Sequence, residues 1–223
     1  MLAGWIGNHC SSPVRECGVA FTFFFRDQRV LDSIVQKLAP DVPHHGAIRV
    51  WDAGCSSGEE AYSVAMLVFE NLWPIASGGL RIDATDIEEN SQFANTIATG
   101  IYSSELLKGS PYQELLTKYS HPAGRPGFVE FDAGLRECIF YQRHDLLSLR
   151  PIGDNFSVIV CKNVLLHLAY DQQVNVIKMF YNALSPGGYL ALDEFQELPP
   201  EVSALFVRVV TDGKLCRKAD RAE

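Results

Sequence analysis

The sequence lacks the long apolar runs that would cross a membrane. No stretch reaches the roughly 18–20 consecutive apolar residues of a transmembrane helix. The N-terminal segment also lacks the basic region followed by an apolar core that marks a signal peptide. We therefore expect a cytoplasmic protein without membrane insertion. Its 223 residues suffice for one well-packed core with a small appendage.

Cysteine pairs at metal-ligand or disulfide spacing are also absent. The six cysteines form no CxxC pair, and several lie in apolar runs such as SVIVCKNV, where free thiols behave as small hydrophobic residues. His44 and His45 are adjacent but have no partner at metal-ligand spacing, so we expect no metal site. Basic residues are a minority, and the formal net charge of −8 argues against nucleic acid as the main partner.

The segment 50–63, VWDAGCSSGEEAYS, has the layout of a nucleotide-binding turn but lacks the phosphate-binding motifs. An apolar strand runs into a small-residue turn containing Gly54 and Gly58, and a helical pattern follows directly. Glycines let a backbone approach a ligand, and a helix N-terminus offers unpaired N–H groups. The turn matches neither GxxxxGKS/T nor GxGxxG, and Glu59 and Glu60 stand where a phosphate would require neutral or basic groups. The pattern favours a nucleoside with positive charge, and S-adenosylmethionine, with its sulfonium and ammonium groups, meets that description.

Strand and helix patterns alternate along most of the chain. The strand-like runs are 48–51, 80–85, 156–161 and 189–192. The helical patterns are 30–38, 59–72, 91–99 and 170–184. This alternation predicts an α/β fold with a doubly wound, mostly parallel sheet that binds ligands at the carboxyl ends of its strands. We expect an irregular arm over residues 1–20 and one domain over residues 21–223.

The alternation breaks between residues 121 and 145. A turn-rich segment, HPAGRPG, precedes two strand-like runs, FVEF and CIFYQ, and the residues between these runs have a turn composition. We predict a small antiparallel β excursion here, a β-subdomain inserted at about residues 121–145.

Acidic residues flank the glycine turn at two positions. Asp86 closes the second expected strand, where an acidic side chain hydrogen-bonds the ribose hydroxyls of a nucleoside. Its alternative role is a helix N-cap, and Asp83 competes for the ribose role from within the strand. Glu59 opens the following helix, a position that the helix dipole alone favours for acidic residues. We expect Glu59 to face the cationic methionyl end of the cofactor, because the dipole does not explain the small-residue turn before it.

The order of these motifs is more specific than any one of them. The segments FTFFFRD, RVWDAGCSSGEEAYSVA, IDATDIEEN, ATGIYSS, VIVCKNVLLHL and LSPGGYLAL closely resemble, in order, the motif series of the chemotaxis-receptor glutamate O-methyltransferases (CheR-type). The match runs from about residue 20 to about residue 195. It implies the seven-stranded sheet of a class I S-adenosylmethionine-dependent methyltransferase. Gly54 of the turn is one candidate cofactor contact. The motif positions imply further contacts at Thr22, Arg26, Glu59, Asp86, Asp145, Leu146, Lys162 and Asn163.

The resemblance also implies separate roles for these residues. Arg26 would engage the methionyl part near the reacting centre and is the candidate catalytic residue, whereas Asp145 and Leu146 would lie by the adenine. An arginine beside three phenylalanines suits recognition of a carboxylate, and it also suits a side chain that snorkels out of an apolar patch. Lys162 and Asn163 directly follow the expected strand 156–161, where a polar pair can simply mark the point at which the chain meets water.

The implied reaction is methyl transfer from S-adenosylmethionine to a glutamate of a methyl-accepting receptor, with S-adenosylhomocysteine as product. A glutamate with a pKa near 4.3 is already ionised at neutral pH, so no general base is needed. Two alternatives remain open, a methyltransferase with a small-molecule or other protein acceptor and a non-catalytic cofactor-binding or scaffold module. The sequence departs from the family at Asp52, where serine is common, and at His167, where an aromatic residue is usual and where we expect a wall or packing residue.

Overall fold

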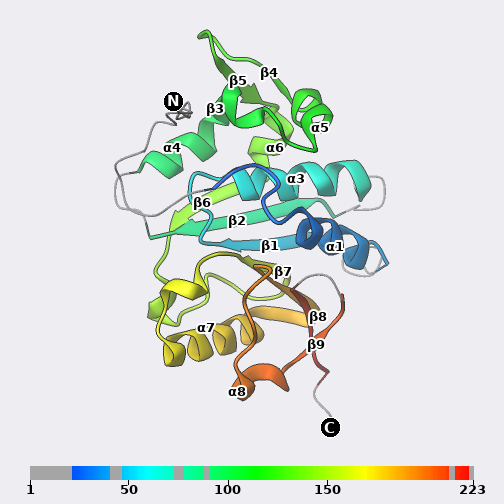
Figure 1. Ribbon diagram of the computed structural model, residues 1–223, viewed down its shortest axis with the longest axis vertical. Helices are drawn as coiled ribbons and strands as arrows, with labels where there is room; N and C mark the ends of the chain where they lie inside the picture. The colour runs from blue at the N-terminus through cyan, green and yellow to red at the C-terminus, as the bar shows by residue number, and fades with distance from the viewer. Residues whose placement is uncertain (1–21, 41–46, 73–77, 88–90, 211–213, 221–223) are drawn as a thin grey trace, which may run out of the picture.

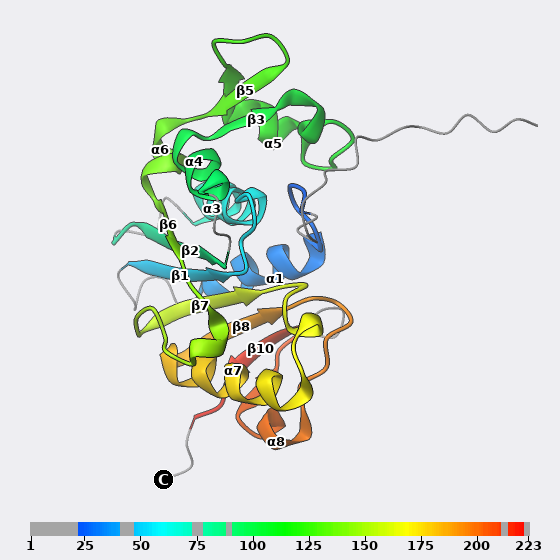
Figure 2. The same ribbon diagram turned by 90° about the vertical axis from the view of Figure 1, so that its left-hand side faces the viewer.

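The computed structural model describes residues 22–40, 47–72, 78–87, 91–210 and 214–220 (Figure 1). The arm expected over residues 1–20 and the histidine pair at 44–45 lie outside these residues. The described part contains a seven-stranded sheet covered by helices and a separate three-stranded sheet at one end of the molecule (Figures 1 and 2). None of its helices combines the length and apolar character needed to cross a membrane.

The seven-stranded sheet confirms the predicted doubly wound, mostly parallel architecture. Its strands are β1 (Ile48–Ala53), β2 (Leu80–Asp86), β6 (Ile139–Arg143), β7 (Phe156–Cys161), β8 (Leu184–Leu192), β9 (Phe206–Arg208) and β10 (Leu215–Lys218). They lie in the order β6-β2-β1-β7-β8-β10-β9, and β10 pairs antiparallel with both of its neighbours, whereas the pairs from β6 to β8 are parallel. The order reverses between β1 and β7, and in such sheets the ligand binds at this switch point.

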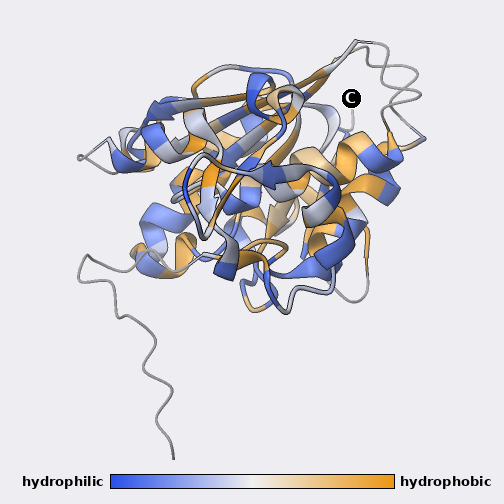
Figure 3. Cartoon of the chain, turned by 90° about the horizontal axis from the view of Figure 1, so that it is seen from above, coloured by the Kyte–Doolittle hydropathy of each residue, from blue (hydrophilic) through white to orange (hydrophobic). Residues whose placement is uncertain are grey.

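Helices cover both faces of this sheet. The α-helices are α1 (Gln28–Leu38), α3 (Glu59–Asn71), α4 (Gln92–Thr99), α5 (Gln113–Lys118), α6 (Ala133–Glu137), α7 (Tyr170–Ala183) and α8 (Pro200–Ser203). Three short 3-10 helices are η1 (Ser104–Leu107), η2 (Leu146–Ser148) and η3 (Leu165–His167). The helices carry both hydrophilic and hydrophobic residues, as expected for elements that bury one face only (Figure 3).

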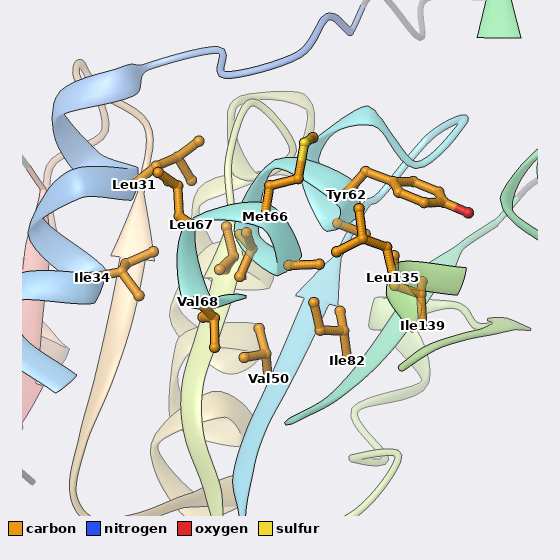
Figure 4. Packing of buried hydrophobic residues seen from close by; sticks show 14 of the residues in the cluster. Leu31, Ile34, Val50, Tyr62, Met66, Leu67, Val68, Ile82, Leu135 and Ile139 are labelled. Carbon is orange, nitrogen blue, oxygen red and sulfur yellow. The ribbon is translucent and has the colours of Figure 1, made fainter. Parts of the chain in front are cut away.

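The core divides into two clusters because neighbouring strand residues point to opposite faces of the sheet. Val50 belongs to the cluster beneath α1 and α3, whereas Trp51 belongs to the cluster beneath α7. Figure 4 shows the first cluster, in which Val68 of α3 points toward the sheet, where Val50 and Ile82 lie. The positions that predicted an amphipathic helix in α1 are all buried, so tertiary packing stabilises the helix through the face that the sequence pattern marked.

The bounds of the β excursion differ from the prediction. The small sheet consists of β3 (Ile101–Ser103), β5 (Phe128–Phe131) and β4 (Ser120–Pro122), paired antiparallel in this order. The run CIFYQ does not join it, because β6 pairs in parallel with β2 as the edge strand of the large sheet. The residues expected as a turn form α6 instead. A strand pattern reveals that a segment is extended but not which neighbour it pairs with, and for this reason the prediction put β6 in the wrong sheet.

Candidate functional site

A cavity of about 730 Å³ lies at the carboxyl ends of β1, β2, β6 and β7. All but one of the predicted site residues line it, namely Thr22, Arg26, Gly54, Asp86, Asp145, Leu146, Lys162 and Asn163. Segments distant in sequence meet here because the carboxyl ends of parallel strands share one edge of the sheet. The exception among the predicted residues is Glu59.

The glycine turn is held against the end of β2. The backbone N–H groups of Gly54 and Cys55 both donate to the carbonyl oxygen of Thr85, at 2.8 and 2.9 Å. Gly54 has a φ of +98°, and a Cβ atom added to it would lie 2.2 Å from Cγ2 of Val164. Glycine is therefore required at this position by its backbone conformation and by the side chain that packs over it.

Asp86 also holds the glycine turn in place, through a hydrogen bond to its backbone. One of its carboxylate oxygens accepts from the backbone N–H of Ser56 at 2.9 Å, and the other accepts from that of Ile87 at 2.7 Å. The helix N-cap role is excluded, because α4 begins at Gln92 with Ser91 as its N-cap. Each carboxylate oxygen has a further lone-pair position, so Asp86 can also accept from a ligand hydroxyl in the cavity that it lines.

Asp83, the competing carboxylate of β2, takes no part in the cavity lining. It is buried and bonded to the guanidinium of Arg81, with the shortest contact at 2.7 Å, and lies 3.6 Å from the guanidinium of Arg49. Its charge is thus matched by arginines within the sheet, three residues before Asp86.

The two glutamates that open α3 have different environments, and the contact of Glu59 with the cofactor stays a prediction. Glu60 lines the cavity, whereas Glu59 is only 3% exposed and accepts hydrogen bonds from the hydroxyl of Ser57 at 2.7 and 2.9 Å. Successive residues of an α-helix point about 100° apart, so only one of two adjacent glutamates can face a given wall. The left-handed backbone of Gly58 (φ 94°) precedes the helix, and the sequence does not reveal the helix phase that follows it.

Lys162 connects the end of β7 to the segment before α1. Its ammonium group is buried, lies 2.8 Å from a carboxylate oxygen of Glu60 and 3.6 Å from that of Asp27, and donates to the carbonyl oxygen of Arg26 at 2.5 Å. The N–H of Phe25 donates to the hydroxyl of Ser63 at 2.9 Å, which ties this segment to α3. Lys162 therefore fixes the glutamate and the arginine that face the cavity.

Arg26 lies at the cavity with its guanidinium carbon 6.0 Å from the ring centroid of Phe23.

Asn163 has a left-handed backbone (φ 57°), and its N–H donates to the carboxylate of Asp193 at 3.2 Å. Backbone conformations of this kind cost energy in non-glycine residues and gather at functional sites.

The wall formed after β6 is mainly apolar. Leu146, Leu147 and Ile87 line it, together with Asp145, whose carboxylate accepts from the N–H of Leu147 at 2.8 Å. His144 also lines the cavity, a residue that no motif of the sequence marked although it precedes Asp145 directly. Burial lowers the pKa of His144, which favours the neutral ring in contact with apolar neighbours.

These residues suit a cationic nucleoside. The apolar wall with Asp145 suits a base, Asp86 at the end of β2 supplies a carboxylate that can accept from ribose hydroxyls, and Glu60 adds another negative group. His167 is a wall residue of the same cavity. Within the described ranges, no three His, Cys, Asp or Glu residues gather as a metal cluster would.

The strand order and this cavity define an S-adenosylmethionine-dependent methyltransferase of the α/β class. The rRNA methyltransferase aviRa from Streptomyces viridochromogenes has the same fold, with a TM-score of 0.53 at 14% identity, over 93% of this chain and 87% of that one. The particular family follows from the sequence. The profile described as "CheR methyltransferase, SAM binding domain" matches residues 20–211, and the chain belongs to this family.

Two relatives illustrate the match. "Chemotaxis protein methyltransferase 2" of Vibrio cholerae is 28% identical over 207 residues, which is 90% of this chain and 69% of the relative. "Chemotaxis protein methyltransferase Cher2" of Pseudomonas putida is 29% identical over 184 residues, which is 79% of this chain and 66% of the relative. The chain thus matches about two thirds of the length of these relatives.

Proposed function

We propose that the chain transfers the methyl group of S-adenosylmethionine to a glutamate side chain of a chemoreceptor-like protein in the cytoplasm, forming a methyl ester. The cofactor supplies an electrophilic methyl group on its sulfonium. The proposal is supported by the family membership and carried by one observation of the cavity, which Arg26 lines together with the acidic residues Glu60, Asp86 and Asp145. An arginine suits a carboxylate acceptor, and the carboxylates suit a cationic cofactor.

The acceptor needs no base, because a glutamate carboxylate is ionised at neutral pH. The work of the chain is then to orient the acceptor and to exclude water from it. Arg26 would pair with the acceptor carboxylate and with the methionyl end of the cofactor. Its backbone is held for this task by Lys162, and Leu166 and His167 form part of the wall that shields the reacting groups.

The remaining contacts are assigned to the cofactor. We propose that Asp86 accepts from the ribose hydroxyls, that Asp145 and Leu146 border the adenine, and that Glu60 rather than Glu59 attracts the ammonium group. Thr22 and Asn163, which line the same cavity, would complete its polar surface.

The test is incubation with methyl-labelled S-adenosylmethionine and the cytoplasmic fragment of a receptor. We expect protein-bound label that alkali releases as methanol. Arg26→Ala should lower this labelling at least about tenfold, the effect of losing one charge-assisted hydrogen bond. The matched control is Arg29→Ala, which removes an exposed arginine three residues away that does not line the cavity. Protein label that resists alkali, or no label despite cofactor binding, would contradict the proposal.

The net charge of −8 favours a second candidate, transfer to an acceptor other than an acidic receptor. Like charges slow the encounter of two proteins at low salt. The same assay distinguishes the two candidates, because label would then appear on a small molecule or on an unrelated protein substrate and not on the receptor fragment.

A further inference from the structure

Asp52 is a buried carboxyl group whose two oxygens accept no hydrogen bond from any described residue. It lies within β1, beside Ala84 of β2 and Val160 of β7, and its exposed fraction is 0%. Taken as a carboxylate, it has no partner for either oxygen within the described part of the chain. A buried polar group without a partner is costly, so the group requires an explanation.

The ammonium group of Lys162 and the N–H groups of the glycine turn are committed to other acceptors. The ammonium of Lys162 serves Glu60 and the carbonyl of Arg26, and its remaining close contact is Asp27. The N–H groups of the glycine turn bond to the carbonyl of Thr85 and to the carboxylate of Asp86. What Asp52 does have within hydrogen-bonding reach is the carboxylate of Glu60 on α3. Two carboxylates cannot hydrogen-bond each other unless one of them carries a proton.

We propose that Asp52 is a positioning residue, a neutral carboxylic acid that donates its proton to Glu60 and thereby fixes the Glu60 side chain at the wall of the cavity. Lys162 holds one oxygen of Glu60 from β7, and Asp52 holds the carboxylate from β1. The pair then carries one negative charge instead of two. This inference goes beyond the proposed methyl transfer, since it concerns the protein without acceptor.

The electrostatic surroundings agree with this arrangement. Burial raises the pKa of Asp52 well above its ordinary value, and the negative charges of Glu60 and Asp86 raise it further, whereas Lys162 lowers it. The thiols of Cys55 and Cys161 also face this cluster, and burial raises the pKa of both, with the neighbouring carboxylates adding to the effect. Both thiols therefore stay neutral, and Lys162 is the cation that balances Glu60.

Thermal unfolding without any ligand tests the protonation. The unfolded chain releases the Asp52 proton above the ordinary aspartate pKa while the folded chain retains it, so the folded state of the wild type loses stability relative to Asp52→Asn as the pH rises. The folded-to-unfolded ratio of wild type relative to this variant should fall by about tenfold per pH unit above pH 4–5, until the folded pKa is reached. A melting-temperature difference that does not change with pH would overturn the proposal.

The matched control is Asp83→Asn on the neighbouring strand. Asp83 is also buried, but it is paired with Arg81, so its replacement should lower the melting temperature at pH 7. At pH 7, Asp83→Asn should thus lower the melting temperature, whereas Asp52→Asn should raise it. If both variants were destabilised at pH 7, Asp52 would be an ionised carboxylate and the proposal would fail.

Calorimetric titration with S-adenosylhomocysteine tests the positioning role. Asparagine can donate to Glu60 as the neutral acid does, whereas alanine cannot. We expect Asp52→Asn to bind within about threefold of the wild type and Asp52→Ala about tenfold more weakly, the effect of one hydrogen bond. Equal affinities of the two variants would refute the positioning role. This readout rests on the proposed cofactor contact of Glu60, whereas the unfolding experiment does not, so the two failures can be told apart.

Discussion

Replacing Gly54 by alanine should destabilise the protein by about 2–5 kcal/mol. The added Cβ would lie 2.2 Å from Cγ2 of Val164, far inside ordinary van der Waals contact. Overpacking of this kind typically costs about 1–3 kcal/mol, and a left-handed backbone costs a non-glycine residue about 1–2 kcal/mol more. The free energy of unfolding, measured by urea denaturation, should fall accordingly, and S-adenosylhomocysteine should bind more weakly because the turn borders the cavity.

Two further variants separate the causes. Gly79 has a similar φ of +83°, but no atom lies within 4 Å of the position that an added Cβ would take, so Gly79→Ala should cost only the backbone part, about 1–2 kcal/mol. Val164→Ala removes the atom that clashes, and it should recover part of the loss in the Gly54→Ala background. A Gly54→Ala variant that is no less stable than Gly79→Ala, or a double variant whose effects are simply additive, would refute the steric argument.

Two further predictions concern the carboxylates. Glu60→Gln should weaken S-adenosylmethionine binding about tenfold, because it removes a negative group from the cavity wall. Glu59→Gln should leave the affinity within about threefold and should instead lower stability, because Glu59 accepts hydrogen bonds from Ser57. Isothermal calorimetry compares the two affinities, and the reverse ranking would contradict the geometry. Asp86→Ala should weaken binding of adenosine but not of free adenine if Asp86 accepts from the ribose, and equal loss for both probes would reduce its role to the anchoring of Ser56.

The strands β1, β2, β7 and β8 of the large sheet were predictable because their sequences are strongly patterned. The short, β-branched apolar run of β7 favours a buried strand, and the spacing of Leu31 and Ile34 in α1 favours an amphipathic helix. In the small sheet, β5 was predicted from the run FVEF, whereas β3 and β4 were not, since they have three residues each, too few to establish a period. The assignment of β6 to the large sheet depends on its pairing with β2, a contact between distant residues that no local pattern contains.

For the site, too, the sequence predicts which segments meet but not how their side chains are oriented. Strand ends at a switch point must meet, so membership of Asp86 and Asn163 in one cavity follows from the strand order, whereas that of Asp145 was implied only by the resemblance to the family. Which atom of each segment faces the ligand depends on helix phase and on the neighbours that compete for each polar group. The sequence therefore placed the acidic pair of α3 at the cavity but did not reveal that Glu60, and not Glu59, lines it.

Asp52 shows that the net charge of the site, too, depends on the fold. From the sequence, an acidic residue in β1 adds one more negative charge to a wall that already includes Glu60 and Asp86. In the fold it has no donor within the described residues, and the one nearby cation, Lys162, is engaged by Glu60. A third charge there would be repelled by the other two in a buried region of low dielectric, so the neutral acid is the form that the packing favours. The charge that attracts a cationic ligand is then set by the burial of one side chain, and not by the number of acidic residues in the motif.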